Sequence, residues 1–159
     1  MILYYALGGG LGHIARSFAL IEKAPEKLLP AIRLLVSSKS AAVALPHSPC
    51  PMDTVPAPAM SDRTLYVKFL SDYLDRHNFS CIVMDTFPFG LLGELKDVAP
   101  ALPRVLVSRY LRWDAYRERC GVLNGALWSQ VVLMIEQQEE AYLETMECNS
   151  RMIEAPWPI

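Results

Sequence analysis

The segment from Gly8 to His13, GGGLGH, has residue types suited to contacting a ligand. It follows an apolar run from Met1 to Leu7 and precedes a helix-like stretch, so it predicts a strand, a glycine turn and a helix. Glycines let the backbone approach a bound molecule closely, and a helix start offers unpaired N–H groups and a positive dipole end to an anion. We therefore expect His13 to lie where this turn meets the ligand.

Two nucleotide-binding patterns do not fit this turn. Counted from Gly8, the dinucleotide pattern G-x-G-x-x-G places His13 where its third glycine belongs. The second predicted strand ends in Ser37-Ser38 instead of the acidic residue that would hold a ribose hydroxyl. No Gly-Lys-Ser/Thr follows the turn, which excludes a phosphate loop of the Walker type.

Strand-like and helix-like segments alternate along the chain. Short apolar runs predict strands at 2–7, 31–36, 52–55, 81–84, 104–107 and 131–135. Helices are expected at 13–23, 39–45 and 89–98, and a helix or an ordered loop at 113–120. Ser61 is expected to cap a further helix, whose core stripe is Leu65, Phe69, Tyr73 and His77. The proline-rich stretch 46–58 is long enough to be a functional loop.

This alternation predicts an α/β fold of the Rossmann-like, doubly wound kind, with a parallel sheet covered by helices on both faces. Ligands of such sheets bind beyond the carboxyl ends of the strands. Three features converge at that edge: the glycine turn with His13, the pair Asp85-Thr86, and the segment Ser108-Arg109-Tyr110.

Composition restricts the partners. The 159 residues, 52% of them hydrophobic, suggest one domain with a good core. A formal net charge of −2 gives no bulk attraction to nucleic acid, so no nucleic-acid partner is expected. No apolar run approaches the roughly 20 residues that span a bilayer. The four cysteines form no C-x-x-C pair, and the chain opens in a strand-like run, so a cytoplasmic location is expected.

The sequence resembles the N-terminal half of a GT-B glycosyltransferase, near the MurG-like and UDP-glycosyltransferase-like families, over nearly its whole length. The first loop of that family is glycine-rich and ends in Gly-His, and its fourth strand ends in Asp followed by Pro-x-Gly. Four segments carry the resemblance: Gly8 to Ser17, Ile82 to Gly90, Val105 to Arg109, and Glu154 to Ile159.

The resemblance implies that residues 1–155 form an acceptor-binding domain and that 156–159 begin a linker to a donor-binding domain. The implied partners are a nucleotide-sugar donor, held mainly by that second domain or a partner chain, and a small-molecule or lipid-linked acceptor. Contact with a membrane surface is compatible with this reading, and no cofactor is implied.

The resemblance also implies roles for single residues. Inverting glycosyl transfer needs a base that takes the proton of the acceptor hydroxyl, and an imidazole titrating near neutral pH suits that task. His13 is the candidate base, and Asp85 would orient it by binding its other nitrogen. The expected substrate-binding residues are Gly9, Gly10, Leu11, Gly12, Thr86 and Arg109.

Each role has a structural alternative. His13 could cap or pack its helix, Asp85 could cap a helix beginning near Phe89, and the glycines could form only a tight turn. The alternative function is a non-catalytic α/β module whose glycine-rich loop binds a nucleotide or phosphate. The two readings differ in whether the side chains of His13 and Asp85 lie within hydrogen-bond reach.

Other polar clusters favour structural roles. Arg112, Arg117 and Arg119 belong to a basic and aromatic cluster that could grip an anionic acceptor or rest on a lipid headgroup surface. Asp114 and Glu118 lie within helical reach of these arginines, so a solvated helix face is the favoured reading. His47 and His77 lack neighbours with metal-ligand spacing, and no metal is expected. The acidic, helix-prone stretch from Glu136 to Glu147 is read as a solvated segment ahead of the linker.

Overall fold

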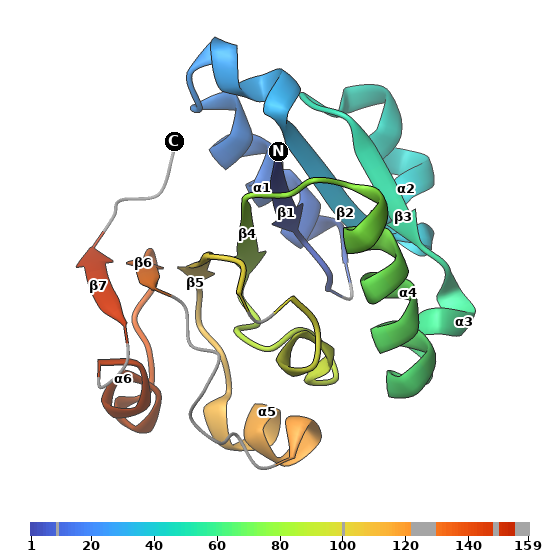
Figure 1. Ribbon diagram of the computed structural model, residues 1–159. Helices are drawn as coiled ribbons and strands as arrows, with labels where there is room; N and C mark the ends of the chain where they lie inside the picture. The colour runs from blue at the N-terminus through green and yellow to red at the C-terminus, as the bar shows by residue number, and fades with distance from the viewer. Residues whose placement is uncertain (9, 100, 122–129, 148–149, 155–159) are drawn as a thin grey trace.

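A single parallel sheet of seven strands forms the centre of the computed structural model, which describes residues 1–8, 10–99, 101–121, 130–147 and 150–154 (Figure 1). The strand order is β3-β2-β1-β4-β5-β6-β7, and every neighbouring pair is parallel. The strands are β1 (Ile2–Tyr5), β2 (Ile32–Ser37), β3 (Met52–Val55), β4 (Cys81–Asp85), β5 (Arg104–Ser108), β6 (Val131–Met134) and β7 (Arg151–Glu154).

Helices cover both faces of the sheet, which confirms the predicted α/β, Rossmann-like class. Alternate residues of β1 point to opposite faces, so Tyr4 packs with one apolar core and Leu3 and Tyr5 with the other. The first core includes α1 (Leu11–Glu22) and α2 (Ser38–Ala44), and the second includes α4 (Arg63–Arg76), α5 (Trp113–Cys120) and α6 (Glu140–Glu147). Shorter helical segments are η1 (Glu26–Ala31), η2 (Leu45–His47), α3 (Ala57–Met60) and η3 (Glu94–Lys96).

The strand order reverses between β1 and β4. The chain builds outward from β1 through β2 to β3, then returns to the centre and builds outward from β4 to β7. In open α/β sheets, the crevice beyond the carboxyl ends of the strands at such a reversal is the usual ligand site. His13 follows β1 and Asp85 ends β4, so the topology brings both residues to this position.

Most predicted elements are confirmed, with small shifts in their ends. The first strand ends at Tyr5 instead of Leu7, and the first helix starts at Leu11 instead of His13. Strand β7 was not predicted, because Arg151–Glu154 is short and has only two apolar residues, Met152 and Ile153, between charged ends at the sheet edge. The implied linker at 156–159 lies outside the described residues.

The fourth helix corrects two predictions. Asp62, not Ser61, is its N-cap: the Asp62 carboxylate accepts hydrogen bonds from the backbone N–H groups of Thr64 and Leu65 at 2.7 and 3.0 Å. The buried stripe is Tyr66, Leu70 and Tyr73, whereas Leu65 is 53% exposed. The predicted stripe is confirmed at Tyr73 and at the half-buried Phe69, which packs against the core, and is wrong at Leu65. Its members lie four residues apart, and a row of that spacing drifts around a helix of 3.6 residues per turn.

The helix predicted over 89–98 is wrong. This segment is a series of turns with one short helical turn, η3. The backbone is left-handed at Gly90 and Gly93, with φ of 84° and 75°, and α-helical hydrogen bonding cannot continue through such residues. The alternative role of Asp85 as a cap for a helix beginning near Phe89 is therefore wrong as well.

The acidic stretch after β6 is more ordered than expected. It contains α6, where Tyr142 and Met146 are fully buried against the second core, and it leads into β7. The reading of this stretch as a solvated segment is therefore wrong. Among the described residues, no helix is both long and apolar enough to cross a membrane.

Candidate active site

The candidate site lies beyond the carboxyl ends of β1, β4 and β5. His13 lies in the first turn of α1, Asp85 is the last residue of β4, and Arg109 directly follows β5. The register pairs Asp85 with Val107, so the end of β4 lies level with the next-to-last residue of β5. Local sequence thus forms three separate elements, and the parallel sheet places their ends together.

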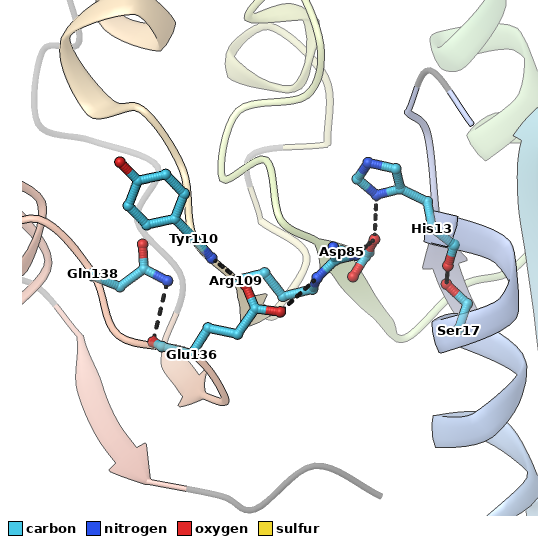
Figure 2. Close-up of polar contacts among 7 residues, drawn as sticks. All are labelled: His13, Ser17, Asp85, Arg109, Tyr110, Glu136 and Gln138. Carbon is cyan, nitrogen blue, oxygen red and sulfur yellow. Dashed lines mark hydrogen bonds and ion pairs between the residues drawn. The ribbon is translucent and has the colours of Figure 1, made fainter. Parts of the chain in front are cut away.

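His13 and Asp85 form a direct hydrogen bond. Imidazole Nδ1 lies 2.6 Å from Asp85 Oδ2, and Figure 2 shows the second ring nitrogen directed away from the carboxylate. The Asp85 side chain is fully buried, and 18% of the His13 side chain is exposed. A carboxylate can only accept at this position, so Nδ1 donates this hydrogen bond. In the neutral imidazole, Nε2 is then the nitrogen that can accept a proton.

Arg109 extends this pair into a chain of charged groups (Figure 2). Its Nη1 lies 3.3 Å from Asp85 Oδ2, and its Nε lies 3.6 Å from Glu136 Oε1. Glu136 also accepts a hydrogen bond from the backbone N–H of Tyr110 at 2.8 Å. Arg109 is 7% exposed, and its guanidinium lies between two carboxylates, which compensate its charge and fix its position.

One carboxylate oxygen of Asp85 lacks a hydrogen-bond partner among the described residues. This oxygen, Oδ1, is buried. Thr86 is 4% exposed, and its buried hydroxyl likewise has no hydrogen-bond partner among the described residues. Thr86 also has a left-handed backbone, with φ of 71°, which is strained for a β-branched residue. Unsatisfied polar atoms and backbone strain concentrate at functional sites more than elsewhere.

A cavity of about 410 Å³ opens beside the imidazole. His13, Thr86 and Arg109 line it together with Phe87. Two exposed arginines complete the lining: Arg112, the residue before α5, and Arg119, which lies in α5. The rings of His13 and Phe87 are stacked with centroids 5.8 Å apart. The cavity is of ligand size, and it contains a proton acceptor, cations and an aromatic surface.

Gly8 is required by the position of the imidazole. A Cβ atom at residue 8 would lie 2.2 Å from His13 Cδ2 and 2.4 Å from His13 Nε2. No side chain fits there without displacing the ring, so the glycine allows close approach. At Gly10, by contrast, a Cβ atom would meet no atom within 4 Å, and φ is −161°.

The structure brings together four of the predicted site residues: His13, Asp85, Thr86 and Arg109. Gly10, Leu11 and Gly12 do not line the cavity beside His13, and Leu11 is 51% exposed on α1. Gly9 lies outside the described residues. The substrate-binding roles of these loop residues stay predictions.

The sequence analysis missed Glu136, and for Arg112 and Arg119 it favoured a solvated helix face over a ligand-binding role. Glu136 lies just after β6, in the same way that Asp85 lies at the end of β4 and Arg109 just after β5. This common position at the end of a strand is a sequence signal by which Glu136 could have been predicted. Arg112 and Arg119 were read as part of a solvated helix face paired with Asp114 and Glu118. In the described chain neither arginine forms such an ion pair, and both line the cavity.

The other histidines and the cysteines of the described residues show no sign of a metal or catalytic site. Within the described ranges, no three His, Cys, Asp or Glu side chains come together as a metal ion would require. His77 ends α4 and packs against the rings of Tyr73 and Phe79, with centroids 4.8 and 5.6 Å away. Burial raises the pKa of the free thiols of Cys50, Cys81 and Cys120, which disfavours reactive thiolates.

Comparison with protein-family models, curated proteins and solved structures finds no match for this chain. The fold class is therefore shown by the sheet topology itself. The case for a function depends on the geometry around His13 and Asp85.

Proposed function

We propose that this chain is the acceptor-binding half of a glycosyltransferase, in which His13 is the general base and Asp85 its orienting carboxylate. The observation that carries the proposal is the 2.6 Å contact between His13 Nδ1 and Asp85 Oδ2 at the edge of an open cavity. A general base must reach the proton it removes, and Nε2 is the nitrogen that Asp85 leaves available.

The chemistry follows from this arrangement. An acceptor hydroxyl in the cavity donates to Nε2, and its oxygen attacks the anomeric carbon of a nucleotide sugar as the bond to the leaving phosphate breaks. The proton moves to Nε2, and the carboxylate of Asp85 stabilises the imidazolium that results. The nucleoside diphosphate leaves with the bonding electrons, so the step is balanced without a cofactor.

The second domain implied by the resemblance would hold the donor. The described chain supplies a base and cations to the cavity. Its glycine turn matches neither the dinucleotide-binding pattern nor the Walker pattern. This division fits the GT-B resemblance of the segments Gly8 to Ser17 and Ile82 to Gly90.

The test is release of nucleoside diphosphate by the product of the whole reading frame, assayed with a panel of nucleotide sugars and a small-molecule extract as the acceptor source. We expect His13→Ala and Asp85→Asn each to lower the rate by about 10³-fold or more, as for other oriented imidazole bases. His47→Ala is the matched control, because His47 is exposed and lies outside the cavity. Equal rates in all four proteins would overturn the proposed roles.

The pH profile sharpens the test. A general base must be unprotonated to act, so a base at His13 predicts a rate that falls as the pH is lowered. Ligand binding that survives His13→Ala, with no sugar transfer under any condition, would instead favour the non-catalytic α/β module.

A further inference from the structure

The carboxylate that holds the His13 ring is shared with a second donor. Nδ1 of His13 and Nη1 of Arg109 both contact Oδ2 of Asp85, at 2.6 and 3.3 Å. The first distance is that of a strong hydrogen bond to a carboxylate, whereas the second lies beyond the usual N–H···O range. The two donors therefore compete for one oxygen, and His13 holds the closer position.

Glu136 contacts the same guanidinium, and Figure 2 shows Arg109 between this carboxylate and Asp85. Oε1 of Glu136 lies 3.6 Å from Arg109 Nε, and Oε2 accepts a hydrogen bond from the Tyr110 backbone N–H at 2.8 Å. The bond to Tyr110 fixes the carboxylate against the segment after β5. The Arg109 side chain is 9% exposed, so solvent screens its attraction to either carboxylate only weakly.

Two further groups face this cluster, one from α1 and one from β1. Burial lowers the pKa of Arg16, and repulsion by Arg109 adds to this effect, whereas Asp85 and Glu136 oppose it. Burial and the charge of Asp85 raise the pKa of Tyr4. Two guanidinium groups are thus matched by two carboxylates. Without the charge of Glu136, Asp85 would be the only carboxylate of this group facing both arginines.

The second oxygen of Asp85 allows Arg109 to move. Oδ1 has no hydrogen-bond partner among the described residues, so Asp85 can accept a second N–H group of the guanidinium. Arginine prefers such paired contacts with both oxygens of a carboxylate. An arginine released from Glu136 would therefore close on Asp85 and displace Nδ1 of His13 from Oδ2.

We propose that Glu136 is a positioning residue of the candidate active site, which holds Arg109 back from Asp85 and so keeps Oδ2 for Nδ1 of His13. Glu136 acts through Arg109 and does not itself contact the imidazole. The inference rests on the proposed function for the role of His13 as a base, whereas the effect on the imidazole requires no turnover.

The experiment compares nitrogen NMR spectra of the His13 imidazole, whose signals are those that His13→Ala removes. In Glu136→Gln the amide oxygen can still accept from the Tyr110 N–H, but the charge that attracts Arg109 is gone. We expect the signature of a protonated Nδ1 to weaken and the Nε2–H tautomer to appear.

Glu139→Gln is the matched control for this variant. Glu139 belongs to the same segment between β6 and α6, and its carboxylate accepts from the Tyr110 hydroxyl and from the Trp113 backbone N–H, both at 3.1 Å. The substitution removes an equal charge from the same loop contact, and we expect the His13 spectrum to stay unchanged.

A double-mutant cycle tests the route through Arg109. Arg109→Met removes the competing cation and should preserve the signature of a protonated Nδ1, and Glu136→Gln should have little further effect in that background. In the chain that retains Arg109, Glu136→Gln should lower kcat for nucleoside diphosphate release about ten- to a hundredfold, because a misplaced ring is a poorly oriented base. The KM for the nucleotide sugar should not change. Circular dichroism checks that each variant is folded.

Three results would overturn the inference: an unchanged His13 spectrum in folded Glu136→Gln, an equal change in Glu139→Gln, or loss of the protonated Nδ1 signature in Arg109→Met. The last of these stays informative even where Glu136→Gln does not fold. A spectrum that changes as expected without sugar transfer by any protein would count against the proposed function alone. Transfer that requires His13 but is unaffected by Glu136→Gln would count against this inference alone.

Discussion

Two carboxylates are buried at the same edge of the sheet, and they have opposite surroundings. Glu94 in η3 has both oxygens occupied: Oε1 accepts from the backbone N–H of Leu91 at 2.9 Å and from the Tyr5 hydroxyl, and Oε2 accepts from the N–H of Leu92 at 2.7 Å. Asp85 has one oxygen contacted by His13 and Arg109, and one without a partner among the described residues.

The difference indicates what each carboxylate does. Glu94 satisfies the backbone of the loop from Phe87 to Gly93, and a Cβ at Gly90 would lie 1.9 Å from its Oε1, so this loop closes tightly around it. Such full satisfaction fixes a structure. Asp85 contacts two side chains at the margin of a cavity and retains an unused acceptor, which is the arrangement expected where chemistry or binding occurs.

The same truncation at both carboxylates gives the largest expected effect. Glu94→Ala should lower the free energy of unfolding by about 3 kcal/mol, because two part-buried N–H groups and a buried tyrosine hydroxyl lose their acceptor. Asp85→Ala should lower it by about 1 kcal/mol, since Arg109 keeps Glu136 as a partner. Urea unfolding followed by tryptophan fluorescence measures both, with the exposed Glu22→Ala as the control. Equal losses would contradict the contrast.

A second substitution tests the close packing on the Asp85 side. Gly8→Ala should cost about 2 kcal/mol of stability and move the imidazole off Asp85, because the new Cβ would overlap the ring. Nitrogen NMR of the imidazole should then lose the signature of a protonated Nδ1. Gly10→Ala is the matched control, since a Cβ there meets nothing within 4 Å. An unshifted His13 spectrum in Gly8→Ala would show that the ring does not depend on this glycine.

Backbone strain next to Asp85, at Thr86, can also be tested by substitution. Thr86→Gly should raise the free energy of unfolding by about 0.5 kcal/mol, because glycine adopts φ of 71° without steric cost. Ala99→Gly, at φ of 41°, should give a similar gain away from the site. Thermal unfolding checks both, and only Thr86→Gly is expected to alter nucleoside diphosphate release. A loss of stability in Thr86→Gly alone would mean that contacts of the threonine outweigh its strain.

The smallest expected effect is a pH dependence at Glu94. Burial raises the pKa of Glu94, and hydrogen bonds from Tyr5 and from the backbone of Leu91 and Leu92 offset part of that rise. Above the ordinary value of 4.5 the folded protein therefore binds more protons than the unfolded chain, so stability should fall as pH rises through this window. Urea unfolding at several pH values should show a negative slope that Glu94→Gln removes. A slope retained in Glu94→Gln would place its origin at another group.

Much of the fold could be predicted because its signals are local. Apolar runs ending in polar residues mark β1, β4 and β5, and parallel strands bring their ends to one edge, so His13, Asp85 and Arg109 could be grouped without coordinates. The prediction over 89–98 failed because an apolar stretch with helical spacing does not show that Gly90 and Gly93 turn left-handed.

The sequence by itself determined the alternation of strands and helices and the set of polar residues that follow the strands, since both depend on side-chain periodicity and on glycine and proline positions. The tertiary structure alone decided the pairing of His13 with Asp85, the saturation of Glu94 and the approach of Arg119 to the cavity beside His13. These depend on which face of the sheet each helix covers and on how loops far apart in the chain meet. A local pattern does not contain that information.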